Sequence, residues 1–283
     1  MFNLFITPYI NIFGFKLYYY GIVYAIGFLA TYFYFRHQSK SKKLDLTLDQ
    51  IDSLIIYIII GGVLGGRLGE FIFFQPHTLI TNPLQILMIR DGGMSIHGGL
   101  LGVWGAIWLF RKRHKKIPYY EITDNAVMIG AFTLFFGRIA NFINSELCGR
   151  LSTLPWAVNL HTPTSNGWEQ YPNCQGFRHP SQLYEALKNI FIGITLLIVE
   201  SIEQKTNRYK LGFKTWLFVF MYGILRIITN IWRDDVLWFF GILSTGQVLS
   251  LIMVLISGFM LIKYYWFGRK NTHSKRLRKK LNK

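Results

Sequence analysis

Long apolar segments without charge constrain this chain more than any other feature of its sequence. Residues 17–35, 92–110 and 236–262 contain no Asp, Glu, Lys or Arg. About 20 apolar residues in a helix cross the ~30 Å hydrocarbon core of a bilayer. Four more segments qualify when an occasional polar residue is allowed. We therefore expect an all-α integral membrane protein with seven transmembrane helices, over residues 17–35, 52–74, 92–110, 124–141, 181–201, 212–229 and 240–262.

The composition excludes several classes of soluble protein. Hydrophobic residues make up 51% of the 283 residues and aromatic residues 17%, which excludes a disordered chain. The 31 Lys and Arg against 14 Asp and Glu give a net charge of +17. A nucleic-acid-binding protein carries such charge on a polar, soluble surface, so we expect no nucleic-acid partner. Apolar and basic character together are typical of an integral membrane protein.

The basic residues predict the orientation of the expected spans. Groups of Lys and Arg follow the first, third, fifth and seventh spans, whereas few follow the second, fourth and sixth. Basic loops stay on the cytoplasmic side of a membrane. The N-terminus is therefore expected outside and the C-terminus inside. Residues 263–283 form a tail with nine basic residues, which we expect at the cytoplasmic face on anionic lipid.

The segment 142–180 is too long to be a simple connection between two spans. Unstructured loops above about 15 residues are uncommon in compact domains, so we expect a small external head on what is otherwise a single membrane domain over residues 1–283. Cys148 and Cys174 both lie in this segment. The outer side of a membrane permits oxidation, and the sequence leaves open whether the two cysteines form a disulfide or remain unrelated thiols.

Small residues recur every four positions in the second expected span, at Gly61, Gly65 and Gly69. Such rows allow two helix backbones to approach closely. We interpret them as a helix-packing surface in preference to a ligand contact.

Polar side chains inside the expected spans predict a functional cavity. An Arg at the centre of a membrane helix costs about 2.5–3.5 kcal/mol on insertion scales. With the N-terminus outside, these polar residues all fall toward the outer leaflet: Tyr20, Arg67, Glu70, His97, Arg138, Asn141, Asn144, Glu146, His179, Glu185, Arg226, Asn230 and Arg233. Because the guanidinium fork suits phosphate, we expect an anion-binding cavity there, with no metal or cofactor.

Five sequence blocks, in the same order along the chain, resemble the bacterial prolipoprotein diacylglyceryl transferase family. Residues 137–149 read Gly-Arg-Ile-Ala-Asn-Phe-Ile-Asn-Ser-Glu-Leu-Cys-Gly, which is similar to the family pattern G-R-x-G/A-N-F-x-N-x-E-x-x-G. The other blocks are Tyr20-Gly21, residues 91–99, residues 178–185 and Tyr222-Gly223-x-x-Arg226.

The resemblance implies a seven-helix enzyme of the bacterial inner membrane with its active site toward the outer leaflet. Such an enzyme transfers the diacylglyceryl group of phosphatidylglycerol to the lipobox cysteine thiol of a prolipoprotein signal peptide. A thioether forms and glycerol phosphate is released, without a cofactor. Carried over by position, the site residues are Tyr20, His97, Arg138, Asn141, Glu146, Gly149 and Arg226.

The chemistry assigns roles to these residues as hypotheses. His97 is the candidate base for the thiol, although an arginine that lowers the pKa of the thiol is the alternative. Arg138 and Arg226 would stabilise the leaving phosphate. Tyr20, Asn141, Glu146 and Gly149 would bind substrate together with Arg138. A supporting role is expected for Arg67, Glu70, Asn144, His179, Glu185, Asn230 and Arg233.

The chain departs from the family pattern at two positions. Asn230 stands where many members have Glu, so an acidic partner for Arg226 or Arg233 is either missing or supplied by Asp234 or Asp235. Cys148 replaces an aromatic residue before the last glycine of the motif. The rival function is a transporter or flippase of anionic lipid, but the sequence has no internal repeat of the kind that many transporters show.

Overall fold

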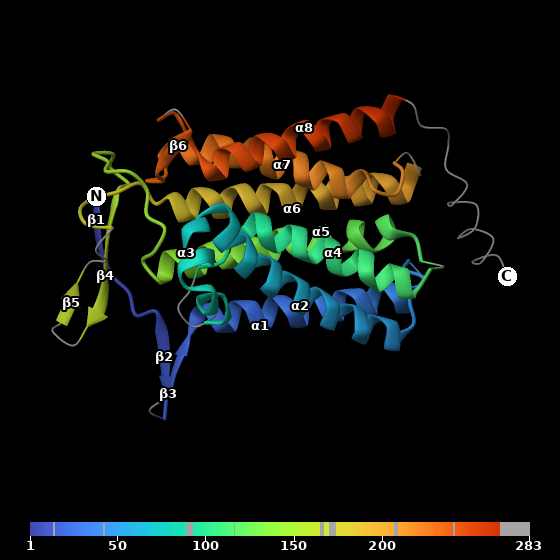
Figure 1. The fold of residues 1–283 in the computed structure, drawn as a ribbon, viewed down its shortest axis with the longest axis horizontal. Helices are drawn as coiled ribbons and strands as arrows, with labels where there is room; N and C mark the ends of the chain where they lie inside the picture. The colour runs from blue at the N-terminus through green and yellow to red at the C-terminus, as the bar shows by residue number, and fades with distance from the viewer. Residues whose placement is uncertain are drawn as a thin grey trace. The chain divides into compact units, whose positions relative to one another are not determined.

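The computed structural model describes residues 1–13, 15–41, 43–88, 93–115, 117–164, 167–169, 174–206, 209–239 and 241–266, and most of them are helical. A long helix lies over each of the seven segments expected to be helical (Figure 1). The long helices are α1 (Tyr19–Lys40), α2 (Leu48–Phe73), α4 (Ile96–Arg113), α5 (Tyr119–Ile143), α6 (Ser181–Thr206), α7 (Phe213–Thr229) and α8 (Thr245–Trp266).

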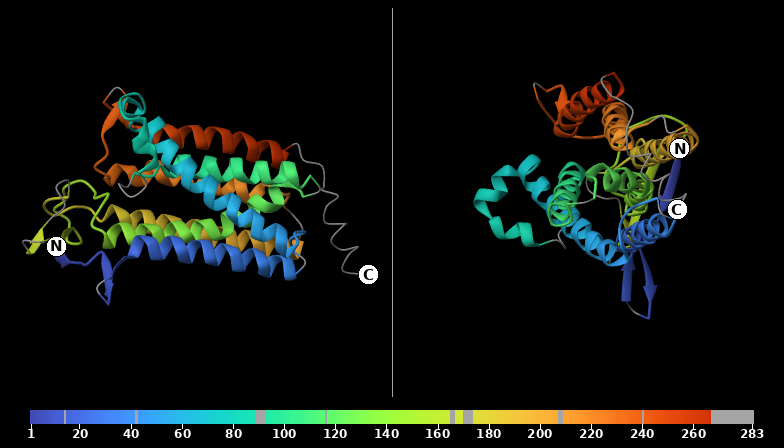
Figure 2. Two further views of the ribbon diagram at one scale, coloured as in Figure 1. Left: turned by 60° about the horizontal axis from the view of Figure 1, so that its bottom comes forward. Right: turned by 90° about the vertical axis from the view of Figure 1, so that its right-hand side faces the viewer.

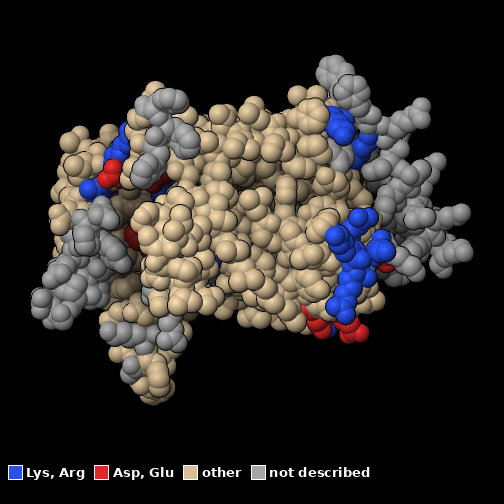
Figure 3. Space-filling model, in the orientation of Figure 1, with Lys and Arg blue, Asp and Glu red and all other residues tan. Residues whose placement is uncertain are grey.

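Four of the described helices are long and apolar enough to cross a membrane, judged by length and composition. They are Leu48–Phe73, Tyr119–Ile143, Phe213–Trp232 and Thr245–Lys263. Large apolar side chains also face outward, and on α8 Leu255, Phe259 and Ile262 are each more than 60% exposed. Figure 3 shows a broad surface without Lys, Arg, Asp or Glu over the middle of the helices, and charges near helix ends. These features identify an integral membrane protein.

The chain divides into two compact units. The first consists of Met1–Ala25, Val127–Val236 and Gly246–Lys283, and the second of Ile26–Ala126 and Leu237–Thr245. Helices α1 and α5 therefore each begin in one unit and end in the other.

In the second unit, α2 and α4 cross through their glycines. A Cβ atom on Gly65 would lie 2.5 Å from the carbonyl oxygen of Gly98 and 2.6 Å from the Cα atom of Gly102. One turn away, a Cβ on Gly61 would lie 2.5 Å from the Cβ of Ala106. Only glycine permits this approach, which confirms the expected packing role of the glycine row.

In the first unit, α6 and α7 lie side by side (Figures 1 and 2). Gly223 of α7 faces α8, because a Cβ there would lie 2.9 Å from the carbonyl oxygen of Ser250. Gly193 of α6 faces Phe132 of α5, because a Cβ there would lie 3.0 Å from the ring. These contacts pack α7 against α8 and α6 against α5.

Short strands occupy the segments outside the long helices, so the fold is mostly helical rather than all-helical. One sheet has the order β1-β4-β5, where β1 (Phe2–Phe5) pairs in parallel with β4 (Val158–Thr164), and β4 pairs antiparallel with β5 (Gly167–Glu169). Two antiparallel pairs join β2 (Tyr9–Ile12) to β3 (Phe15–Tyr18), and β6 (Leu237–Phe239) to β7 (Leu243–Ser244). Phe2 lies opposite Val158, 156 positions away, and a pairing so distant leaves no local sequence pattern.

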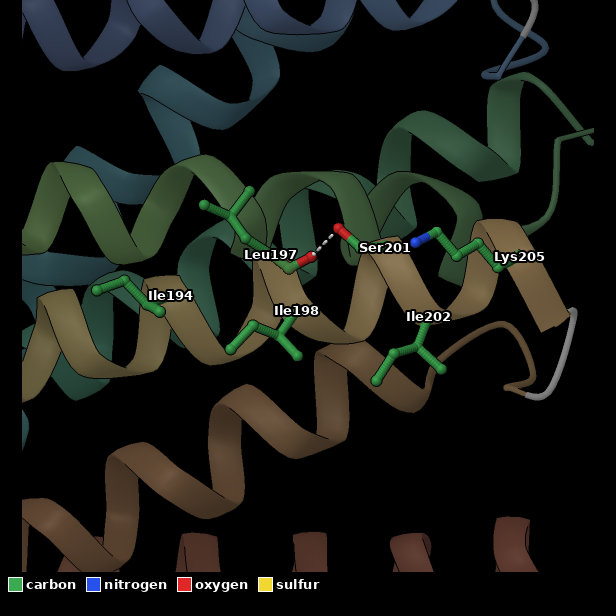
Figure 4. A pocket seen from close by; sticks show the side chains of 6 residues that line it. All are labelled: Ile194, Leu197, Ile198, Ser201, Ile202 and Lys205. Atoms are coloured by element: carbon green, nitrogen blue, oxygen red, sulfur yellow. Dashed lines mark hydrogen bonds between the residues drawn. The ribbon is translucent and has the colours of Figure 1, made fainter.

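A groove of about 270 Å³ runs along α6 (Figure 4). The hydroxyl of Ser201 donates to the carbonyl oxygen of Leu197 at 2.9 Å, so its proton is already used. Apart from Lys205, the remaining lining is aliphatic. The groove therefore suits contact with lipid acyl chains more than it suits chemistry. Its lining residues are Ile194, Leu197, Ile198, Ser201, Ile202 and Lys205.

Candidate functional site

Glu185 lies at the centre of a buried ion-pair cluster in the first unit. Its side chain, in the second turn of α6, is fully buried. Oε1 accepts a hydrogen bond from Arg226 Nη1 at 2.7 Å and another from Thr229 Oγ1. Oε2 accepts from Lys188 Nζ at 2.7 Å, and Arg138 Nε lies 3.6 Å from the same oxygen. Three helices, α5, α6 and α7, each supply one cation to a single carboxylate.

A second carboxylate, that of Asp235, pairs with two arginines, Arg226 near the end of α7 and Arg233 just after it. Arg233 Nη2 donates to Oδ1 at 2.9 Å, and Arg226 Nη2 lies 3.7 Å from Oδ2. Burial alone would raise the pKa of Asp235, but Arg233 and then Arg226 hold it below its usual value. Asp235 is thus the acidic partner that replaces the glutamate absent at Asn230. Asp234 instead pairs with Arg178, at 2.7 Å.

The cluster carries more positive than negative charge. Among the described residues it joins four cations, Arg138, Lys188, Arg226 and Arg233, to two carboxylates. Within this part of the chain, Arg226 Nε and Arg233 Nη1 are buried and have no hydrogen-bond partner. Buried donors are normally satisfied. An excess of positive charge with unsatisfied donors is therefore suited to bind an anion.

The signature segment after α5 extends the cluster from Arg138. Arg138 Nη1 donates to Asn141 Oδ1 at 3.2 Å, and Asn141 Nδ2 donates to Glu146 Oε1 at 2.7 Å. The backbone then takes left-handed conformations at Ser145 (φ 56°) and Leu147 (φ 57°), which are uncommon for residues other than glycine. The structure thus brings together three of the residues that the motif predicts.

The start of α6 holds this turn in place. Ser181 Oγ donates to the carbonyl oxygen of Leu147 at 2.9 Å, and Gln182 Nε2 donates to that of Glu146 at 2.6 Å. A disulfide between Cys148 and Cys174, with Cα atoms 5.6 Å apart, fastens the end of the turn. The sequence left open whether the two cysteines are paired or are unrelated thiols, and in the structure they form a disulfide.

Gly149 is required by the close approach of two other backbone segments. Its N–H donates to the carbonyl oxygen of His179 at 3.2 Å. A Cβ atom at this position would lie 2.5 Å from that oxygen and 2.6 Å from the carbonyl oxygen of Trp232. The contacts of Gly149 in this structure are therefore packing contacts of the turn, which support the cluster.

We expect Gly149→Ala to lower the stability of the protein by about 1–3 kcal/mol, the usual range for overpacking. Backbone atoms on both sides leave the methyl group no space. The melting temperature of the purified protein measures the effect. Gly130→Ala in α5 is the matched control, because no described atom lies within 4 Å of its Cβ position and alanine favours a helix. Equal melting temperatures for the two variants would contradict the packing role.

His179 lies just before α6 among aromatic side chains. Its Nδ1 is 3.2 Å from the hydroxyl of Tyr184, which also accepts a hydrogen bond from Trp156 Nε1 at 2.8 Å. Burial lowers the pKa of His179, so the ring is neutral at neutral pH. His179 therefore adds no charge to the ion pairs.

Arg67, Glu70 and His97 belong to the second unit. His97 is 5% exposed and lies in the first turn of α4, where Ser95 Oγ accepts from the N–H of Gly98 at 3.3 Å. Glu70 Oε1 accepts from Gln75 Nε2 at 3.2 Å.

The guanidinium of Arg67 donates to backbone carbonyl oxygens of the segment before α4, so it positions this segment. Those carbonyls are Gln85 (2.7 Å), Ile86 (3.0 Å), Met88 (2.6 Å) and Gly93 (3.0 Å).

Two parts of the predicted site lie outside the description. The side chain of Tyr20 and the motif residues 91–92 are not among the described atoms.

Two other predicted residues are held by backbone hydrogen bonds. Asn230 is 2% exposed, and its N–H donates to the carbonyl oxygen of Arg226 at the end of α7. Asn144 lies in the signature turn, where its N–H donates to the carbonyl oxygen of Ala140 at 2.9 Å.

Lys188 and Thr229 were not among the predicted site residues. Both contact Glu185, and both have a signal in the sequence. Lys188 is a charged residue within an apolar helix, three positions after Glu185, which is a spacing that brings side chains together. Thr229 follows Arg226 at the same spacing on α7.

Among the described residues, no three His, Cys, Asp or Glu side chains are grouped so that they could hold a metal ion.

Comparison with known proteins adds an independent finding. A model of the family described as prolipoprotein diacylglyceryl transferase matches residues 8–263. Curated relatives named phosphatidylglycerol–prolipoprotein diacylglyceryl transferase match most of the chain. The protein of Rickettsia bellii is 34% identical over 249 residues, 86% of this chain and 89% of the relative. That of Solidesulfovibrio magneticus is 35% identical over 248 residues (86% and 89%), and that of Coxiella burnetii 37% over 252 residues (87% and 90%).

Proposed function

This chain belongs to the prolipoprotein diacylglyceryl transferase family, and on that premise we propose that the ion-pair cluster around Glu185 is its phosphate-binding site. The enzyme transfers the diacylglyceryl group of phosphatidylglycerol to prolipoprotein, which is the first step of lipoprotein lipidation. The observation that supports the site assignment is the excess of positive charge at Arg138, Lys188, Arg226 and Arg233, whose side chains are at most 13% exposed.

The reaction needs positive charge at the leaving group. The sulfur of the lipobox cysteine attacks the glycerol carbon that bears the phosphoester, and the carbon–oxygen bond breaks. The bonding electrons move onto the phosphate oxygen, so glycerol phosphate leaves with one more negative charge than the diester had. Arg138 and Arg226 are assigned to this charge, because fixed donors stabilise charge that develops in the transition state. Asn141 and Glu146 hold Arg138, and Tyr20 binds the substrate.

His97 is assigned as the base that takes the thiol proton. A cysteine thiol has a pKa of about 8.5 and is mostly protonated at neutral pH. A positioned base contributes about 10²–10⁴-fold to such a step. The hydrogen bond from Arg67 to the carbonyl of Gly93 fixes the residues just before α4, and hence the direction in which His97 enters the helix.

We place the protein in the bacterial inner membrane with seven spans, the N-terminus outside and the site toward the outer leaflet. Helices α1, α4 and α6 join the four apolar ones in this assignment. The disulfide supports an outer position for residues 148 and 174, because disulfides persist in oxidising compartments.

A reporter fused after Lys283 tests this orientation. Green fluorescent protein at that position is expected to fluoresce, and alkaline phosphatase to be inactive, because the first folds in the cytoplasm and the second requires disulfides. The reverse result would contradict the orientation. Fusions of both reporters within the loop before α7 provide the matched cytoplasmic control.

The activity itself is tested with purified protein, phosphatidylglycerol vesicles and a synthetic lipobox peptide. Mass spectrometry is expected to find a thioether-linked diacylglyceryl peptide and an equal amount of glycerol phosphate. Movement of lipid between leaflets without this product would instead support a flippase. A peptide with Ser in place of the lipobox cysteine is the control, and it should give no product.

A further inference from the structure

Lys188 is the most deeply placed cation of the cluster. It lies seven residues into α6, about 10 Å along the helix axis from Ser181, and its side chain is 2% exposed. The ammonium group lies 2.7 Å from Glu185 Oε2 on one side and 3.9 Å from the ring centroid of Tyr222 on the other. Tyr222 is itself fully buried. Lys188 is therefore enclosed by protein, and its charged contact is Glu185.

We infer that Lys188 is a positioning residue for the transfer reaction: it occupies Oε2 of Glu185 and so keeps Arg138 directed toward the phosphate. The inference rests on the proposed function of the cluster. It assigns a separate role to a residue that the chemistry does not touch.

The two oxygens of Glu185 have different neighbours, and this difference supports a positioning role for Lys188. Oε1 already accepts from Arg226 and Thr229. Oε2 accepts from Lys188, with Arg138 Nε next to it at 3.6 Å. A shift of less than about 1 Å would bring Arg138 within hydrogen-bond distance of Oε2. If the ammonium group were lost, the buried carboxylate would attract this cation, because an uncompensated buried charge is unfavourable.

Capture of Arg138 by Glu185 would affect the chemical step. Arg138 also donates to Asn141, which donates to Glu146, so its movement would loosen that chain of hydrogen bonds. The excess positive charge of the cluster would also fall from two to one. Phosphate gains negative charge as the carbon–oxygen bond breaks. The loss is therefore expected in kcat more than in the KM for phosphatidylglycerol.

A double-mutant cycle tests this role in membrane vesicles that contain phosphatidylglycerol, with the lipobox peptide as acceptor. Lys188→Met is expected to lower kcat about 10–100-fold, as typical for loss of a supporting partner, with KM within about 3-fold of wild type. In a Glu185→Gln background, the same substitution should change kcat by less than about 3-fold, because no carboxylate remains to capture Arg138. Equal losses in both backgrounds, or an unchanged kcat for Lys188→Met, would overturn the inference.

Two further variants separate positioning from loss of folding. Asn189→Leu is the matched control: it is the next residue of α6, it is 1% exposed, and its amide has no hydrogen-bond partner among the described residues. It should keep kcat within about 3-fold. Lys188→Arg keeps the charge and should recover kcat to within about 5-fold of wild type, whereas a loss equal to that of Lys188→Met would count against the inference.

Protein amount and melting temperature are compared for every variant. Should Lys188→Met not accumulate in the membrane, Lys188→Gln takes its place in the cycle with the same expected results. Failure of the wild-type protein to form the thioether would defeat the proposed function. A wild-type protein that forms it, with no coupling between Lys188 and Glu185, would defeat this inference alone.

Discussion

Replacing Arg226 by alanine is expected to lower kcat by at least about 10²–10³-fold, the usual cost of one donor to developing charge. Arg226 contacts both carboxylates of the cluster, at 2.7 Å from Glu185 and 3.7 Å from Asp235, and its buried Nε lacks a partner among the described residues. The alanine variant therefore loses a phosphate donor and leaves two carboxylates less compensated. Single-turnover rates with phosphatidylglycerol and the lipobox peptide measure the change.

Two variants control this experiment. Arg226→Lys keeps the charge but loses the planar fork, so it should recover only part of the rate. Arg36→Ala removes an arginine whose partner, Asp52, is half exposed and 3.8 Å away, a kind of pair that contributes little. It should retain the wild-type rate. A folded Arg226→Ala protein with a rate within 5-fold, that is about 1 kcal/mol, would refute the assignment of Arg226.

His97→Gln is expected to lower kcat about 10²–10⁴-fold, because it removes the base and keeps a polar side chain of similar size. The rate of thioether formation at neutral pH measures the change. His77→Gln is the matched control, since His77 lies on the short helix α3 (Pro76–Thr81) and is exposed. Near-normal transfer by His97→Gln, together with loss of transfer by Arg138→Ala, would assign thiol activation to an arginine.

Patterns that repeat along the chain predicted the helices well. The long apolar segments predicted the seven helices, and the glycine row predicted a packing surface on α2 without its partner α4, because both patterns depend on residues close in sequence. The signature segment likewise predicted that Arg138, Asn141 and Glu146 lie together, since a short turn after α5 connects them. Asp235 was predicted only as one of two candidate acidic partners, Asp234 being the other, beside the alternative that no such partner exists.

Contacts between distant segments were harder to predict. Glu185 was expected only to support the site, yet it joins cations from three helices, and the spacing of residues within one helix does not reveal its partners on another. Lys188 is noticeable in the sequence because a charged residue within an apolar helix is energetically unfavourable. The sequence does not show, however, which carboxylate compensates its charge. The pairing of β1 with β4 was missed for a similar reason, because its residues Phe2 and Val158 are 156 positions apart in the chain.

The parallel pairing of β1 with β4 has a consequence for biosynthesis. The residues that pair, Phe2 and Val158, are 156 positions apart. At about 5–20 residues per second, β1 waits on the order of 10–30 s for its partner to be synthesised. With the proposed N-terminus outside, this edge strand stays unpaired on the outer side of the membrane while α1 to α5 are inserted. Until then β1 is open to aggregation and proteolysis, and its sheet with β4 forms late in assembly.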